Sequence, residues 1–185
     1  MKTGHEAFEP DAIDLQILAA LQEHGRIALT KMAEQVGLSA PSVIERVKKL
    51  EDLGVITGYH AGVNARKLGK DVTAFIGVSI GDPRTIDVFE DTVEQLDDIL
   101  ECHHVTGEHT VLLKVKTHNT ATLENLIRTI RMIEGVTRTE TMVVLSTYTE
   151  RTQICVNPRE SAHEAGNGKR HRQSAKNPTA EIKRA

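Results

Sequence analysis

The sequence predicts an α+β protein with an N-terminal winged helix-turn-helix domain and a C-terminal ferredoxin-like βαββαβ domain. Apolar residues recur at helical spacing in three short segments before residue 54, and a glycine follows each segment. Between residues 72 and 146, strand-like and helix-like segments follow one another in the order βαββαβ. The predicted domains are residues 9–60 and 72–157, joined by a hinge at 61–71 and followed by a disordered, basic tail at 158–185.

The first two helices are predicted from an apolar stripe and from candidate caps. The first helix begins at Asp11 and is stopped by Gly25. Its inward stripe is formed by Ile13, Ile17, Leu18 and Leu21. A short second helix follows at residues 30–35, with Thr30 as the candidate N-cap.

The third helix follows a tight turn, as in a helix-turn-helix. Gly37 breaks the chain, because a tight turn needs a residue that tolerates positive φ. Ser39 then caps a helix that ends at Gly54, with a buried stripe on one side and charged residues on the other. Residues 55–59 are expected to form a short strand. This order is that of a winged helix-turn-helix.

The C-terminal domain is predicted from a change of pattern after the hinge. Turn signals at Asp82-Pro83 and at residues 106–108 separate its segments. Helices are expected at 85–96 and 120–133, and strands at 72–80, 99–105, 110–116 and 136–146. This order is the split βαβ arrangement.

Composition and charge limit the possible functions. The chain is 39% hydrophobic and 26% charged, as expected for a soluble globular protein, and no apolar run approaches the length of about 20 residues that spans a bilayer. Its two cysteines, Cys102 and Cys155, are too few for a disulfide scaffold, so we expect a reduced, cytoplasmic protein. The formal charge of −3 means that any nucleic-acid contact must come from a local basic face.

Motifs for catalysis and for metal binding are weak. The sequence has no Gly-rich phosphate loop, nucleophile elbow or H-E-x-x-H helix, so we expect neither an enzyme nor a cofactor. One candidate metal cluster consists of Cys102, His103, His104 and His109. Neighbouring residues on a strand point to opposite faces, so we expect no metal there.

Several ordered fragments resemble the Lrp/AsnC family of transcription regulators. The opening D-x-x-D-x-x-I-L pattern is present from Asp11 to Leu18, and His24-Gly25-Arg26 is similar to the family's D-G-R. The recognition-helix pattern is carried by residues 36–39, Val43, Glu45, Arg46, Val47, Leu50, Gly54, Ile56, Gly58 and Tyr59. The C-terminal pattern is carried by residues 101–103, 105–107, Gly135, Val136, Thr139, Thr141, Val143 and Val144. The resemblance covers residues 9–157 and excludes the tail.

The resemblance implies a sequence-specific regulator that binds double-stranded DNA. The N-terminal end of its recognition helix would enter the major groove. The candidate DNA-contacting residues are Ser39, Ala40, Ser42, Glu45, Arg46, Lys49 and Arg26. Arg46 is suited to bidentate pairing with guanine and Lys49 to a phosphate contact, whereas Arg26 either contacts phosphate or pairs with Glu23 or Glu34.

The resemblance also implies a small, amino-acid-like effector at the interface of the C-terminal domains. The matching positions are Gly107, Glu108, His109, Thr110, Thr139, Thr141 and Ser146. The family's turn commonly reads G-D-Y-D, whereas this chain has Thr110 at the last position and lacks that counter-ion for an amino group. Glu108 could supply the charge from a shifted position; a different ligand, no ligand, or a plain hairpin turn remain open.

Assembly and location also follow from the resemblance. We expect a homodimer, with an octamer as a further possibility, in the cytoplasm and associated with the nucleoid. The basic tail either adds nonspecific DNA affinity or only aids solubility. Two alternatives remain: a tetrapyrrole enzyme like the sirohaem decarboxylases, which have a similar architecture, and a ligand-sensing oligomer without DNA binding.

Overall fold

A computed structural model of the chain describes residues 8–156, which form two compact units. The helical unit contains residues 8–61 together with 151–156, and the sheet unit contains residues 62–150. The predicted tail lies outside the described residues. Among those that are described, no helix is long and apolar enough to cross a membrane.

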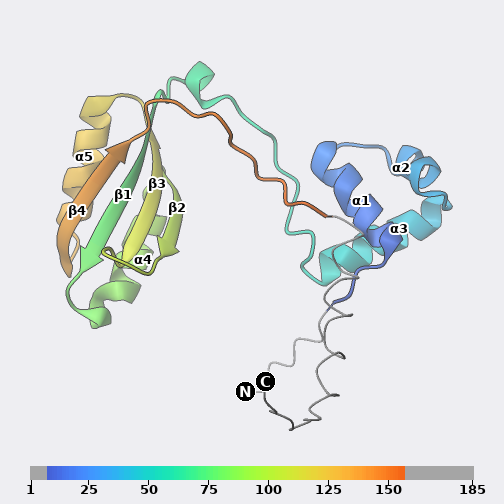
Figure 1. Ribbon diagram of the computed structural model, residues 1–185, viewed down its shortest axis with the longest axis horizontal. Helices are drawn as coiled ribbons and strands as arrows, with labels where there is room; N and C mark the ends of the chain where they lie inside the picture. The colour runs from blue at the N-terminus through green and yellow to red at the C-terminus, as the bar shows by residue number, and fades with distance from the viewer. Residues whose placement is uncertain (1–7, 157–185) are drawn as a thin grey trace, which may run out of the picture. The chain divides into compact units, whose positions relative to one another are not determined.

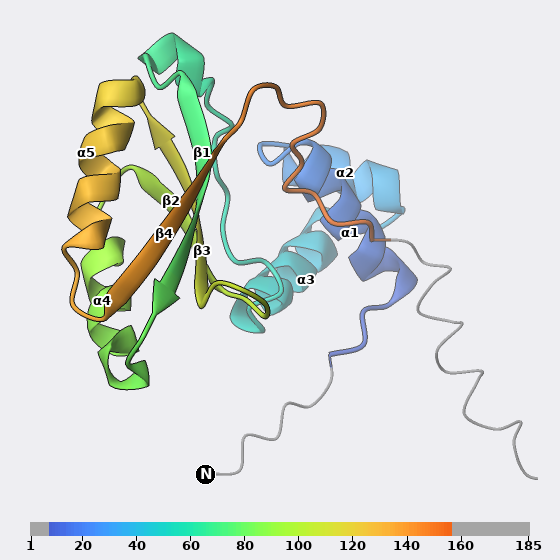
Figure 2. The same ribbon diagram turned by 60° about the vertical axis from the view of Figure 1, so that its left-hand side comes forward.

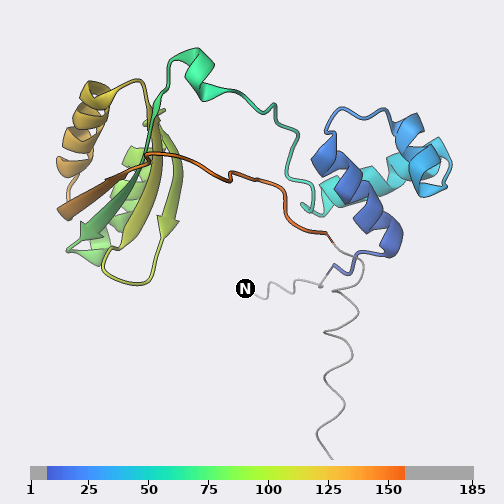
Figure 3. The same ribbon diagram turned by 45° about the horizontal axis from the view of Figure 1, so that its top comes forward.

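The helical unit is a cluster of three helices (Figures 2 and 3). These are α1 (Ala12–Glu23), α2 (Leu29–Val36) and α3 (Ala40–Asp52). Their fully or nearly fully buried core consists of Ile17, Met32, Ala33, Val43, Val47 and Leu50. Each helix has one apolar stripe, which an isolated helix could not bury. The three stripes pack against one another and form this core.

The turn between α2 and α3 has the geometry that its residues predict. Gly37 adopts φ 71°, a left-handed conformation that costs little only for glycine. The Ser39 side chain then accepts a hydrogen bond from the backbone N–H of Ser42, and Pro41 lies in the first turn of α3. The helix-turn-helix expected from the sequence is therefore present.

Two local predictions in this unit are wrong. Residues 55–59 form no strand, because the described part of the unit offers no second strand to pair with them. Instead, the N–H groups of Val55 and Ile56 both donate to the carbonyl of Leu50. Thr30 does not cap α2, which begins one residue earlier after Ala28 and has no side-chain cap.

Residues 151–156, assigned from the sequence to the end of the C-terminal domain, make their contacts with the helical unit. The Gln22 side chain forms two hydrogen bonds with the backbone of Ile154, of 3.1 and 2.9 Å, and the Gln153 amide donates to the Gln22 carbonyl at 2.7 Å. We call residues 151–156 the C-terminal strap.

The sheet unit is an antiparallel four-stranded sheet with both long helices on one face (Figure 1). Its elements are β1 (Val72–Ile80), α4 (Ile86–Glu94), β2 (Ile99–His104), β3 (Val111–Thr117), α5 (Thr120–Arg131) and β4 (Val136–Val143). The strand order is β2-β3-β1-β4, so the first and third strands are central, as the βαββαβ arrangement requires. A short 3-10 helix, η1 (Ala65–Leu68), lies in the predicted hinge.

Strand alternation divides the sheet into a helix-covered face and an open face. On β1 and β3, the buried side chains Ala74, Ile76, Val78, Val111, Leu113 and Val115 pack in one core with α4 and α5. The intervening residues, including Phe75, Gly77 and Ser79 on β1, project to the open face. The strand pairing places Thr139 opposite Val78 and Glu140 opposite Gly77, so Thr139 faces the helices and Glu140 the open face.

Candidate nucleic-acid interface and effector turn

The N-terminal end of α3 presents a small polar surface. The Ser39 and Ser42 hydroxyls lie 2.8 Å apart, and Ser39 also caps the helix. Ala40 lies half-buried beside them, whereas Glu45 and Lys49 are exposed further along the helix. Arg26 is exposed and forms no salt bridge with Glu23 or Glu34 among the described residues, so the pairing alternative for Arg26 is not supported.

Arg46 is engaged by two carboxylates of α1. Its Nη1 atom donates to Asp11 Oδ2 at 2.7 Å and to Asp14 Oδ1 at 2.6 Å. Asp11 is the N-cap of α1, and its backbone N–H in turn donates to Asp14 Oδ2. One guanidinium therefore ties the recognition helix to the capping box of the first helix.

Ionisation of this cluster is set by its hydrogen bonds. The backbone N–H of Asp14, and then the Arg46 guanidinium, lower the pKa of Asp11. The same two carboxylates raise the pKa of Arg46, with Asp11 first. With two carboxylates and one guanidinium, the cluster carries a net negative charge, which does not favour contact between Arg46 and a phosphate.

Asp14 is the residue of this cluster that sequence reasoning missed. Its position off the apolar stripe predicts an exposed side chain, yet Asp14 is only 7% exposed. A buried carboxylate needs a charged or hydrogen-bonding partner, and Arg46 supplies both. The D-x-x-D spacing is the signal in the sequence, because it puts an N-cap and its N3 partner at the start of one helix.

The predicted effector turn, residues 107–110, lies between β2 and β3. Gly107 adopts φ 125°, which residues with a side chain rarely adopt. Glu108 is exposed and its carboxylate pairs with Arg138 of β4. His109 is half-buried, whereas the Thr110 hydroxyl accepts a hydrogen bond from the backbone N–H of Ile80 at 3.1 Å. Thr110 is therefore used to join this turn to β1.

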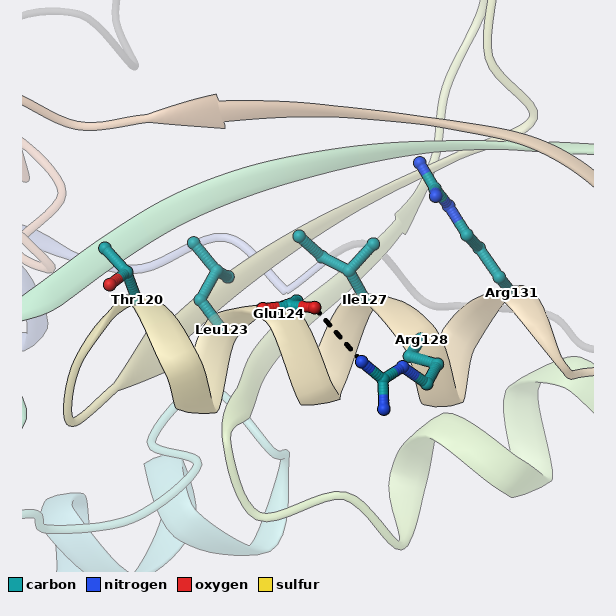
Figure 4. A pocket seen from close by; sticks show the side chains of 6 residues that line it. All are labelled: Thr120, Leu123, Glu124, Ile127, Arg128 and Arg131. Carbon is teal, nitrogen blue, oxygen red and sulfur yellow. Dashed lines mark hydrogen bonds and ion pairs between the residues drawn. The ribbon is translucent and has the colours of Figure 1, made fainter.

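Within one chain, the structure does not bring all the predicted effector residues together. Thr139 faces the helices and accepts a 2.7 Å hydrogen bond from Arg131, which extends from α5 toward the sheet (Figure 4). Thr141 faces the same side, because it pairs with Ile76. Ser146 follows the far end of β4, where that strand pairs with Ala74 rather than with the residues beside the turn.

The four residues of the candidate metal cluster also separate. Cys102 and His104 share the helix-covered side of the edge strand β2, where His104 contacts Glu90 of α4. Burial, followed by the charge of Glu90, raises the pKa of the Cys102 thiol. His103 faces the other side, next to Glu101, and His109 belongs to the turn. The expectation that these four do not form one site is consistent with this separation.

Comparison with known proteins identifies both units. The family model for the AsnC-type helix-turn-helix domain matches residues 11–51, and the model for the Lrp/AsnC ligand-binding domain matches residues 73–154. The chain belongs to the Lrp/AsnC family. The predicted family and the predicted fold class are both confirmed.

Individual relatives match this Lrp/AsnC chain along most of its length. The HTH-type transcriptional regulator YezC of Bacillus subtilis is 43% identical over 136 residues, which cover 74% of this chain and 94% of YezC. The structure of Escherichia coli AsnC is 32% identical with a TM-score of 0.74, covering 79% of this chain and 99% of that one. The transcriptional regulator NMB0573 of Neisseria meningitidis, in complex with L-Met, is 28% identical with a TM-score of 0.77, covering 80% and 98%.

These matches make the chain a transcriptional regulator of the Lrp/AsnC type, with a helix-turn-helix domain and a ligand-binding domain. The matched segments lie within residues 9–157, the range of the resemblance seen in the motifs, and they include both the D-x-x-D opening and the turn at residues 107–110.

Proposed function

We propose that this chain binds specific double-stranded DNA sequences through α3, and that a small molecule at the turn 107–110 modulates this binding. The observation that carries the proposal is the exposed polar end of α3, which follows the Gly37 turn and is held by α1 and α2. A braced helix with an exposed N-terminal end is the arrangement that reads base edges in the major groove. Regulators of the same family match both units.

In this proposal, the residues of α3 divide into three roles. Ser39, Ala40, Ser42 and Glu45 face the bases. Lys49, with its neighbour Lys48, contacts phosphates, because both are exposed cations. Arg46 positions α3 through Asp11 and Asp14 instead of pairing with guanine, since its Nη1 already serves two carboxylates. Arg26 is retained as a phosphate contact.

The open face of the sheet is the proposed dimer surface. It carries Phe75 and Leu112, both only half-buried, and Met142, which is 48% exposed. A sheet that is covered by helices on one side buries the apolar residues of its other side only against a second layer, and the same face of a second copy would supply that layer.

Light scattering of the wild type should give the mass of at least a dimer, and Phe75→Glu should shift the protein toward the monomer. A monomeric wild type would contradict the proposed dimer surface.

The proposed effector site is the turn itself, with Gly107, Glu108 and His109 as its members. Support comes from the left-handed Gly107, which permits close approach of a ligand to the backbone, and from the relative that binds L-Met. Thr139, Thr141 and Ser146 are left out, because the first two face the helices and the third lies at the other end of the sheet. A cytoplasmic location fits a regulator of this type.

Fluorescence anisotropy with a duplex from upstream of the protein's own gene tests the proposal. A scrambled duplex of the same length serves as the control, and both are titrated across a salt series. We expect tighter binding to the upstream duplex, with an affinity that falls steeply as salt rises. Equal binding to both duplexes would contradict sequence-specific recognition of this region and would favour a DNA-silent sensor or the tetrapyrrole alternative.

A further inference from the structure

We propose that Glu108, His109 and Glu140 form a binding site for a divalent transition-metal ion such as Zn²⁺ at the effector turn. The proposal deepens the effector part of the proposed function, and its regulatory meaning rests on that function. One ligand atom from each side chain lies within 4.8 Å of the other two. His109 Nε2 and Glu140 Oε2 are 3.5 Å apart, close to the separation of about 3.3 Å between two tetrahedral ligands at zinc.

The open face holds the His109 ring in a defined place. The ring packs over Gly77, and even a Cβ atom at that position would collide with three atoms of the imidazole. Glu140 pairs with Gly77 across β1 and β4, so the same glycine places the imidazole beside the carboxylate. A side chain held by packing loses less conformational entropy when it binds a ligand.

The second ring nitrogen is oriented as it is in metal sites. His109 Nδ1 lies 3.4 Å from the Ser79 hydroxyl, and that hydroxyl donates to the backbone carbonyl of Glu108 at 3.5 Å. In the tautomer in which Nδ1 carries the ring proton and donates to Ser79, Nε2 offers a lone pair toward Glu140. In that tautomer Nε2 and the Glu140 carboxylate are both acceptors and can bind one cation together, and ligating histidines usually donate their other N–H in this way.

The net charge of the cluster favours a cation at this position. The Arg138 guanidinium contacts both carboxylates, so the group of two glutamates and one arginine keeps one net negative charge. In a single chain, the His109 side chain is 15% exposed, and those of Glu140 and Glu108 are 45% and 67% exposed. A dimer formed through the open faces would place the second copy next to this site. One imidazole nitrogen and two carboxylates suit zinc, nickel or cobalt better than Mg²⁺ or Ca²⁺, which prefer oxygen ligands alone.

Isothermal titration of the full chain with ZnCl₂, under a thiol-free reductant and without DNA, tests the site. Wild type should bind one Zn²⁺ ion per chain. His109→Gln and Glu140→Gln should each lower the Zn²⁺ affinity at least tenfold, and Ser79→Ala should lower it by about tenfold. His103→Gln, on the same open face, is the matched control and should bind like wild type. MgCl₂ should give no saturable binding.

The proposal is overturned if His109→Gln and Glu140→Gln bind Zn²⁺ as tightly as wild type, or if wild type shows no saturable binding. Because Glu140 is exposed, its variant keeps the test valid even if a His109 variant misfolds. Arg138→Gln should bind at least as tightly as wild type, since it removes a competing cation; weaker binding would overturn the proposed ligand set.

The regulatory part is tested separately by adding ZnCl₂ to the DNA titration. A change in DNA affinity is expected for wild type and not for His109→Gln, and an equal change in both would overturn it. Failure of the upstream duplex to bind leaves the calorimetric result on the metal site unaffected, so the two proposals fail independently.

Discussion

Replacing Arg46 with Met separates a positioning role of this residue from a role in DNA contact. Methionine keeps the unbranched aliphatic stem and removes the guanidinium that joins α3 to Asp11 and Asp14. The variant leaves the Asp14 carboxylate, which is 7% exposed, without its cation. A net loss of about 1.5–3 kcal/mol is typical for a hydrogen bond to a charged group, and the partial exposure of Arg46 and Asp11 reduces the sum of the two bonds here.

We therefore expect the helical unit to lose about 2–3 kcal/mol of unfolding free energy, which corresponds to a fall in Tm on the order of 10–20 °C. Urea unfolding, followed by circular dichroism at the helix band, measures the loss. Asp14→Asn and the double variant complete a cycle, and the pair should show a favourable coupling energy. Lys49→Met is the matched control, because Lys49 lies exposed on the same helix and forms no ion pair within the described part of the chain.

The DNA assay distinguishes the two roles of Arg46. A positioning residue lowers affinity without changing the salt dependence, whereas loss of a phosphate contact lowers the salt slope by about 0.9. We expect the first behaviour for Arg46→Met and the second for Lys49→Met. The reasoning is refuted if Arg46→Met unfolds like wild type and yet loses specific binding, since Arg46 would then act on DNA directly.

Three further predictions follow from other contacts. The contacts of Arg46 with Asp11 should stabilise the protein fully above the ordinary pKa of Asp, about 3.9, and this contribution should be lost as the pH falls through the lowered pKa of Asp11. The difference in unfolding free energy between wild type and Arg46→Met should therefore shrink in acid. An unchanged difference at acid pH contradicts this. Burial is the larger cause and the hydrogen bond to Glu51 the second cause that raise the pKa of Tyr59 to about 12. In an ultraviolet titration its phenol should ionise well above the ordinary value of about 10, and Glu51→Gln should lower that pKa. Ionisation near the ordinary value would contradict the Glu51 contact. Gln22→Ala removes the two side-chain hydrogen bonds to Ile154 in the C-terminal strap, so trypsin should cleave after Arg151 faster than in wild type, whereas Gln16→Ala on the same helix should leave the rate unchanged. Equal rates in all three would show that the Gln22 side chain does not hold the strap.

Much of the fold could be predicted because its signals are local. The residues predicted for β1 are those that form it, and Ser39 caps α3 as expected, since both depend on side chains within a few positions of one another. Gly37 was identifiable as a turn for the same reason. Helix ends were less accurate: the expected last helix extended to residue 133, whereas α5 ends at Arg131.

The candidate site was only partly predictable. The turn 107–110 could be identified from its own residues. Arg138 pairs with Glu108 of this turn and with Glu140, but no residue pattern in the segment 136–146 predicts that Arg138 and Glu140 lie beside the turn. They reach the turn because β4 pairs with β1 in one register, and a shift of one residue would exchange Glu140 for Thr139 or Thr141.

The sequence by itself determined the three N-terminal helices, the βαββαβ order, the Ser39 cap, the Gly37 turn and the family, because each depends on short patterns of residue type. Tertiary structure alone decided what Arg46 contacts, which face Thr139 occupies, and where residues 151–156 pack. The Arg46 side chain meets carboxylates 32 and 35 positions earlier, and Gln22 meets Ile154 across 132 positions. Contacts at such separation arise only when packing brings helices and strands together, so no local pattern can encode them.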